Sequence, residues 1–111
     1  MEKQIRIKAA VLVIATGILG SAIAPALAAD SAGADLYKTK CASCHGPDGR
    51  GDTPAGKALK VRDLHSAEVT AMSEKELTSV IAQGKNKMPP FGKSLKKEQI
   101  RQLVGYVRGL R

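Results

Sequence analysis

Two cysteines and a histidine stand together in this chain, in the segment Cys41-Ala42-Ser43-Cys44-His45. This C-x-x-C-H pattern is typical of covalent haem attachment, in which each thiol adds to a vinyl group and leaves a thioether bond. The histidine directly follows the second cysteine, so we expect its imidazole to lie beneath the iron as an axial ligand. The pattern predicts one haem c, with Cys41 and Cys44 as the attachment residues and His45 as the proximal ligand.

A C-x-x-C pair also occurs in thiol–disulfide oxidoreductases and in zinc sites. A zinc site needs further ligands, but the chain has no third cysteine and only one other histidine, His65. A thioredoxin-like pair lies within alternating strands and helices, and no segment of this sequence alternates in that way. Haem attachment is therefore the favoured interpretation, with a zinc site and a thiol–disulfide site as the alternatives.

A methionine on a stiff loop is the candidate for the opposite side of the iron, in the segment Lys87-Met88-Pro89-Pro90-Phe91. Pro89 disfavours helical angles at Met88, and each proline fixes its own φ angle, so the segment should be extended. A c-type iron bound by histidine commonly takes methionine as its second axial ligand, and this pairing raises the reduction potential. We therefore predict Met88 as the distal ligand.

Two other residues compete with Met88 for this position. Met72 directly precedes Ser73, where a helix is expected to begin, and is placed as a hydrophobic staple residue. His65 lies in a polar stretch and is expected to face solvent. Iron held by His65 instead of a methionine would have a lower potential.

The elements that must position these residues are helices and loops. A first helix is expected from about Gly33 to Ser43, and a glycine-rich loop follows over residues 46–52. After a basic loop over residues 56–66, a capping box of Ser73 and Glu76 opens a helix that ends at Gly84. Since no segment alternates like a strand, the chain is predicted to be all-α.

A last helix is expected from about Lys96 to Leu110, with one apolar face at helical spacing. That face consists of Ile100, Leu103, Val104 and Val107. Gly105 interrupts this helix at a cost of about 1 kcal/mol relative to alanine. Either Gly105 allows a close approach of the first helix near Gly33, or it is tolerated on an exposed face.

With these motifs in place, the chain resembles the class I cytochromes c, and among them the small single-haem bacterial and photosynthetic electron carriers. The resemblance runs from about Gly33 to the C-terminus and rests on the following residues: Gly33, Tyr37, Cys41, Cys44, His45, Met88, Pro89, Leu103, Gly105 and Tyr106. It implies a cytochrome c-like fold of three to five short helices wrapped around one covalently bound haem. In this family a proline carbonyl accepts a hydrogen bond from the proximal histidine, and Pro54 is the candidate. With no Trp and one Phe in the chain, the haem pocket should be lined mainly by aliphatic residues.

The N-terminal sequence is typical of an export signal. A basic start is followed by an apolar run over residues 9–24, short for a membrane span, and then by Ala26-Leu27-Ala28. This pattern predicts a cleaved secretory signal peptide over residues 1–28, cut after Ala28 or Ala29, with an uncleaved anchor as the alternative. Residues 29–111 would form a single cytochrome c domain of about 80 residues, which is small for an independent core. The expected location is the periplasm or an equivalent lumen.

The chain is basic, with 18 Lys and Arg against 10 Asp and Glu and a net charge of +8. The basic residues are not interleaved with aromatic ones, which argues against a nucleic-acid partner. The surplus instead favours steering toward redox partners with acidic docking surfaces, and transient association with membrane complexes. The lysines expected around the docking edge are Lys57, Lys60, Lys85, Lys87 and Lys93. We expect a monomer.

The predicted function is one-electron transfer, without enzyme activity. Iron held by both His45 and Met88 has no open coordination site, and the redox chemistry belongs to the haem. The alternative is an electron-entry haem subunit of a larger redox enzyme complex, which should present a large apolar interface. Few large apolar residues are left over for such an interface, which favours a free carrier.

Overall fold

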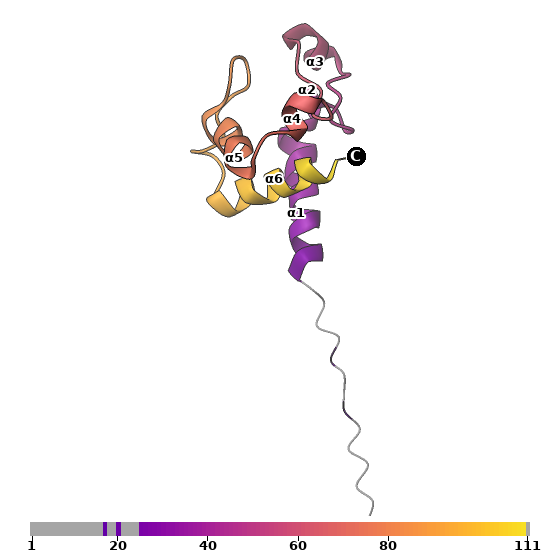
Figure 1. Cartoon of the computed structure of the whole chain (residues 1–111), viewed down its shortest axis with the longest axis vertical. Coiled ribbons are helices and arrows are strands. Elements are labelled where there is room, and N and C mark those ends of the chain that lie inside the picture. Colours follow the sequence, from indigo (N-terminus) through magenta and orange to yellow (C-terminus); the bar gives the residue numbers. More distant parts are fainter. Residues whose placement is uncertain (1–16, 18–19, 21–24, 111) are drawn as a thin grey trace, which may run out of the picture.

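The computed structural model describes residues 25–110, together with Gly17 and Gly20. For residues 25–29 it describes the backbone alone. The predicted signal peptide therefore lies largely outside the described residues. Six helices and no strand occur in the described part of the chain (Figure 1). They are α1 Pro25–Lys40, α2 Ala42–His45, α3 Pro54–Leu59, α4 Ala67–Thr70, α5 Glu74–Gln83 and α6 Lys97–Gly109.

The all-α prediction is confirmed, but the helices number six rather than three to five. The difference comes from α2 and α4, which have four residues each. Within the described range, no helix combines the length and apolar character needed to cross a membrane.

Helices α1 and α6 cross in close contact (Figure 1). A Cβ at Gly33 would lie 2.5 Å from the carbonyl oxygen of Gln102 and 3.1 Å from Cβ of Tyr106. Tyr37 lies one turn further along and is only 2% exposed. Its ring packs against that of Tyr106 with 4.9 Å between the ring centroids. Glycine at position 33 thus allows the two helices to approach at backbone distance.

Gly105 does not take part in this crossing. It is exposed, and a Cβ added there would meet no atom within 4 Å. Of the two interpretations of Gly105, tolerance on an exposed face is therefore the one that holds.

The first helix differs from its predicted bounds at both ends. It begins at Pro25 rather than near Gly33, and it ends at Lys40. Cys41 forms a turn, and the chain then continues as the single turn α2. The backbone hydrogen bonds continue across this break, since the amide of Cys41 donates to Tyr37 (2.9 Å) and that of His45 donates to Cys41 (2.9 Å).

Helix α5 forms as its capping box predicts. The Ser73 side chain accepts a hydrogen bond from the amide of Glu76, and the Glu76 carboxylate accepts one from the amide of Ser73. Leu77 and Ile81 are buried, and Gly84 ends the helix with a φ of +74°.

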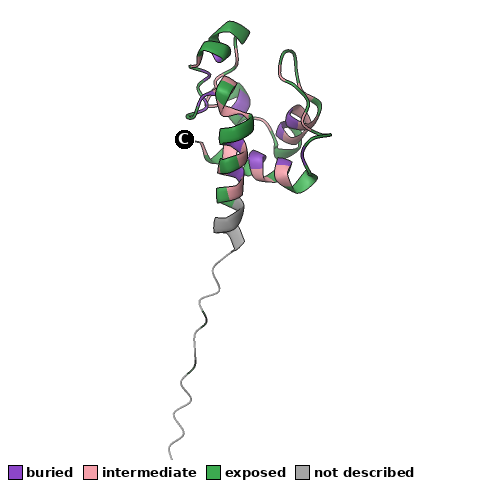
Figure 2. Cartoon of the chain, turned by 180° about the vertical axis from the view of Figure 1, so that it is seen from behind, coloured by how far each residue is buried: buried purple, intermediate pink, exposed green. Residues whose placement is uncertain are grey.

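Helix α6 begins at Lys97, one residue after the predicted start, and buries Ile100, Leu103 and Val104. Val107 was expected on the same buried face, but it is only half-buried. Figure 2 shows the buried residues as short patches on the helices, with exposed residues over most of the remaining ribbon. The core is thus small and concentrated where α1, α5 and α6 meet.

Candidate functional site

The predicted haem-attachment segment lies in the turn at Cys41 and in α2, where Cys41, Cys44 and His45 are all half-buried. Helix α3 holds this segment from the side. The Thr53 hydroxyl donates to the carbonyl oxygens of Ser43 (2.8 Å) and Cys44 (3.1 Å). Thr53 also caps α3 by accepting from the amide of Gly56 (2.9 Å). One side chain therefore fixes both the cap of α3 and the backbone of the attachment segment.

Gly56 brings α3 into direct contact with this segment. A Cβ at Gly56 would collide with the carbonyl oxygens of Cys44 and Gly51. Neither Thr53 nor Gly56 was predicted to be part of the site. Thr53 followed by Pro54 is a signal that could have located this helix start, since proline favours the first helical position.

The His45 ring has a buried nitrogen without a partner in the described part of the chain. Its Nδ1 is buried and has no hydrogen-bond partner among the described residues. Burial lowers the pKa of His45, which favours the neutral imidazole that a metal ion requires. Because Nδ1 is enclosed by the protein, Nε2 is the nitrogen that fits an iron ligand.

The expected hydrogen bond from His45 to the carbonyl of Pro54 is not formed, so that prediction is wrong. Pro54 instead occupies the first turn of α3, where its fixed φ angle suits the helix start. Its carbonyl lies in the first turn of a helix and is available to the α3 hydrogen-bond ladder.

The residue after His45 is anchored by a buried tyrosine. The Tyr37 hydroxyl donates to the carbonyl oxygen of Gly46 over 2.7 Å. Burial raises the pKa of Tyr37, which keeps the hydroxyl protonated as a donor. Helix α1 therefore holds the attachment segment at its C-terminal end.

The thiol chemistry of Cys41 argues against a thiol–disulfide oxidoreductase. Burial, with a smaller contribution from Cys44, raises the pKa of Cys41 to about 11. A redox-active cysteine instead needs a lowered pKa, because the thiolate is the nucleophile. The zinc alternative also lacks support, since the described residues hold no group of three or more His, Cys, Asp or Glu that could bind a metal ion.

The backbone fixes the position of Met88. The amide of Met88 donates to Lys85 (2.9 Å), and the amide of Lys85 donates to Met88 (3.2 Å). Gly84 allows this tight loop, because a Cβ there would lie 2.5 Å from the Met88 carbonyl oxygen and 2.9 Å from the nitrogen of Pro90. Met88 is half-buried and, like Cys41, packs against the single hydrophobic core.

The loop after Met88 is fastened back onto α5. The amide of Phe91 donates to the carbonyl of Ile81 (3.0 Å), and that of Gly92 donates to Ala82 (2.9 Å). Two hydrogen bonds to the last turns of α5 thus hold the segment that follows the two prolines.

A cavity of about 410 Å³ opens between the 64–72 segment, α5 and the end of α6. Its lining is mainly aliphatic and comprises Leu64, His65, Val69, Thr70, Met72, Leu77, Val107, Arg108 and Leu110. Cys41, His45 and Met88 are not among the lining residues, whereas both competitors of Met88 are.

The competitors of Met88 have other partners in this cavity. Met72 and Leu77 both line it, as the two members of a hydrophobic staple should. His65 is half-buried and its ring contact is exposed, so the expectation that it faces solvent holds only in part. Its Nε2 lies 2.6 Å from the carbonyl oxygen of Asp48, so one of its two ring nitrogens already has a partner within the chain.

Known proteins are similar to this chain over most of its length. The family model described as cytochrome c oxidase, cbb3-type, subunit III matches residues 28–107. Cytochrome c6 of Nostoc sp. is 42% identical over 86 residues, which cover 77% of this chain and 75% of that protein.

Solved structures agree with the sequence comparison. The c-type cytochrome KustC0563 superposes with a TM-score of 0.65 at 36% identity, covering 71% of this chain and 96% of that one. Cytochrome c6 from the diatom Phaeodactylum tricornutum gives a TM-score of 0.52 at 30% identity, over 72% of this chain and 91% of that one. The chain therefore belongs to the class I cytochromes c, with a covalently bound c-type haem that serves electron transport.

Proposed function

We propose that this protein is a one-electron carrier in which His45 and Met88 are the axial ligands of the haem iron and both stay bound in either oxidation state. The observation that carries the proposal is the state of His45, whose lowered pKa and buried Nδ1, unpartnered among the described residues, favour a neutral imidazole. The closed turn at Met88 supports it, because the turn fixes the backbone of the second ligand.

The residues of the chain have three tasks in this proposal. Cys41 and Cys44 attach the haem, which supplies the redox chemistry when bound. Thr53 and Tyr37 hold the backbone on either side of His45. Methionine ligation favours a fairly positive reduction potential.

With both axial positions filled, no coordination site is open to a substrate, so we propose that the protein is not itself an enzyme. The second candidate is an electron-entry subunit of a larger enzyme. The description of the matching family model, which names an oxidase subunit, favours that candidate. Against it, Leu59 is the single large hydrophobic residue exposed among those described, at 39%. A permanent subunit needs a larger apolar patch.

We further propose that residues 1–28 are a cleaved signal peptide and that the domain of residues 29–111 works as a monomer in the periplasm or an equivalent lumen. Its redox partners would present acidic docking surfaces. Lys85, Lys87 and Lys93 are all exposed around the Met88 loop, which supports this docking mode. Lys57 forms an ion pair with Asp52 over 2.8 Å, so its charge is partly balanced within the chain.

The visible spectrum tests the ligation. The protein is produced with haem-attachment machinery and recorded in the oxidised and reduced states. Sharp c-type bands after reduction, together with the weak sulfur-to-iron band in the oxidised state, would support His45 and Met88 as ligands. Covalent haem without the sulfur band would refute Met88 as the distal ligand and reopen catalysis at the iron.

A further inference from the structure

The loop between His45 and α3 cannot hold its conformation by burying side chains. Its sequence is Gly46-Pro47-Asp48-Gly49-Arg50-Gly51-Asp52, without any aliphatic or aromatic side chain except the proline ring. Nevertheless Gly46, Gly49 and Gly51 are buried, and all three have positive φ angles of 71–80°. Polar contacts must therefore keep this loop in place.

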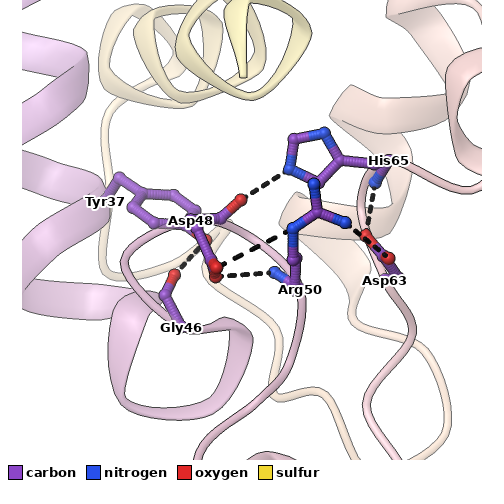
Figure 3. Close-up of polar contacts among 6 residues, drawn as sticks. All are labelled: Tyr37, Gly46, Asp48, Arg50, Asp63 and His65. Carbon is purple, nitrogen blue, oxygen red and sulfur yellow. Dashed lines mark hydrogen bonds and ion pairs between the residues drawn. The ribbon is translucent and has the colours of Figure 1, made fainter. Parts of the chain in front are cut away.

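Besides the bond from Tyr37 to Gly46, several of these contacts come from the segment Asp63–His65, and Figure 3 draws those made by Asp63 and His65. His65 Nε2 lies 2.6 Å from the carbonyl oxygen of Asp48, and the amide of Leu64 donates to the carbonyl of Gly49 over 2.8 Å. The Asp63 carboxylate in turn accepts from the amide of His65 (2.8 Å). We call the side chains of Asp48, Arg50, Asp63 and His65 the polar clasp.

The members of the polar clasp differ in strength. The Arg50 guanidinium lies 3.9 Å from the Asp48 carboxylate and 3.8 Å from that of Asp63, and these three side chains are 41–59% exposed. Exposed ion pairs of this kind contribute only about 0–1 kcal/mol to stability, because water and salt screen them. The His65 contact is also exposed, but at 2.6 Å it is a hydrogen bond, whereas the Arg50 pairs at 3.8 Å and 3.9 Å are not, so His65 should contribute more than Arg50.

The clasp also lies against the cavity. A Cβ at Gly49 would lie 3.0 Å from Cδ1 of Leu110 and 3.4 Å from Cβ of Leu64. Leu64, His65 and Leu110 all line the cavity. The loop held by His65 therefore covers one wall of the cavity. Its first residue, Gly46, directly follows His45.

We propose that His65, supported by the rest of the polar clasp, is a positioning residue for the proximal side of the haem site. It holds the 46–52 loop closed over the apolar cavity wall, which keeps water out and steadies the backbone that follows His45. Solvent access and local dielectric control the potential of a metal centre, so release of this loop should lower the reduction potential. The inference rests on the proposed role of His45 as proximal ligand.

The test uses the haem-loaded protein and four variants. His65→Ala removes the contact, His65→Gln keeps a donor at nearly the position of Nε2, and Arg50→Ala removes only the exposed ion pairs. Arg101→Ala is the control, because it deletes an exposed ion pair to Glu98 within α6. The readouts are hydrogen exchange of the Leu64 amide and the reduction potential.

We expect His65→Ala to speed exchange at Leu64 about fivefold, the effect of losing one hydrogen bond, and to lower the potential. His65→Gln should restore both readouts, Arg50→Ala should change exchange by less than about twofold, and Arg101→Ala should match the wild type. An unchanged His65→Ala, or a His65→Gln that behaves like His65→Ala, would overturn the inference.

Loss of haem from a variant and failure of the proposed ligation can each be recognised separately. If His65→Ala does not retain haem, the wild type, His65→Gln and Arg50→Ala are compared instead. Hydrogen exchange at the Leu64 amide that is faster in His65→Gln than in Arg50→Ala would then overturn the inference. The sulfur-to-iron band of the wild type tests the proposed ligation separately, since it does not depend on His65.

Discussion

At the scale of single residues, the environment of each side chain decides which chemistry it supports. A histidine that binds a metal usually donates its second ring N–H to an acceptor, which orients the ring. His45 has no such acceptor among the described residues. Its orientation therefore depends on the backbone around it, through the hydrogen bond from the Gly51 amide to its own carbonyl (2.7 Å) and that from Tyr37 to Gly46 (2.7 Å).

The first prediction concerns Met88. In Met88→Ala the oxidised protein should lose the sulfur-to-iron band, and its reduction potential should fall, because a soft neutral ligand that favours ferrous iron is gone. Absorption spectra and a redox titration measure both effects. Met72→Leu is the matched control, since Met72 is a cavity-lining methionine and should be replaceable by an aliphatic side chain. If Met72→Leu loses the band and Met88→Ala keeps it, the ligand assignment is reversed.

The second prediction concerns Glu76 and the pH dependence of stability. Hydrogen bonds from the amide and hydroxyl of Ser73 hold the pKa of Glu76 below its usual value. A carboxyl whose pKa is lower in the folded state adds stability above its unfolded pKa, and this stability is lost as the pH falls through the folded value. Glu76→Gln should therefore unfold more easily than the wild type at neutral pH, and the difference should shrink below about pH 4.3, the ordinary glutamate pKa.

Denaturant unfolding of the haem-loaded protein over a pH series measures this difference. Glu74→Gln serves as the control, because it removes a carboxylate from the same first turn of α5 without touching the capping box. A gap between Glu76→Gln and the wild type that persists unchanged into acid would show that the ionised carboxylate is not responsible.

At the scale of elements, two glycines in contacting helices have opposite roles. Gly33 lies where α1 meets the backbone of α6, whereas Gly105 faces open space. Both glycines lie inside helices, where alanine is intrinsically preferred. Their surroundings, and not their helix propensity, therefore decide what a methyl group does at each position.

This contrast gives the third prediction. Gly33→Ala should destabilise the protein by about 1–3 kcal/mol, because its Cβ must displace the Gln102 carbonyl and overpacking costs that much. Gly105→Ala should stabilise it by up to about 1 kcal/mol through helix propensity. Urea unfolding midpoints at an unchanged slope measure both effects. Equal responses of the two variants would contradict the close approach at Gly33.

Elements with local signals could be predicted from the sequence, and those that depend on distant contacts could not. Helix α5 was predicted closely because Ser73, Glu76 and Gly84 are signals within the segment itself. The break at Cys41 was not predicted, since the segment from about Gly33 to Ser43 reads as one continuous helix. In the site, Cys41, Cys44 and His45 form a contiguous pattern. By contrast, the pairing of His65 with Asp48 joins residues 17 positions apart, and no local pattern announces it.

At the scale of the whole molecule, the described chain has a small core. Only eight hydrophobic residues are buried, and three of them, Tyr37, Leu103 and Val104, are almost fully enclosed. Domains of this size bury too little apolar surface for comfort and often depend on a cofactor. The haem attached at Cys41 and Cys44 is thus expected to complete the core.

The fourth prediction follows from that small core. A Cys41→Ser/Cys44→Ser variant, which cannot attach haem covalently, should be largely unfolded when purified without haem. Far-UV circular dichroism should show the loss of most helix, and urea should produce no cooperative transition. The haem-loaded wild type is the reference. A haem-free variant with native helix content and a cooperative transition would show that the polypeptide core suffices.

The last prediction concerns the charge that the molecule presents to its partners. Lys85, Lys87 and Lys93 are exposed around the Met88 loop, so an anionic oxidant should be steered toward that edge. Oxidation of the reduced protein by hexacyanoferrate(III) should therefore slow as salt rises, since the Debye length falls to about 10 Å at 0.1 M. A cationic cobalt(III) complex should show the opposite trend.

Lys87→Glu and Lys75→Glu separate local steering from net charge, because both change the total charge equally and Lys75 lies in the first turn of α5. At low salt Lys87→Glu should slow the reaction with hexacyanoferrate(III) by a factor of about 2 to 5, and Lys75→Glu should slow it less. Stopped-flow kinetics at several ionic strengths measures both. If the two variants are equally slow, only the net charge matters and the Met88 loop is not the docking edge.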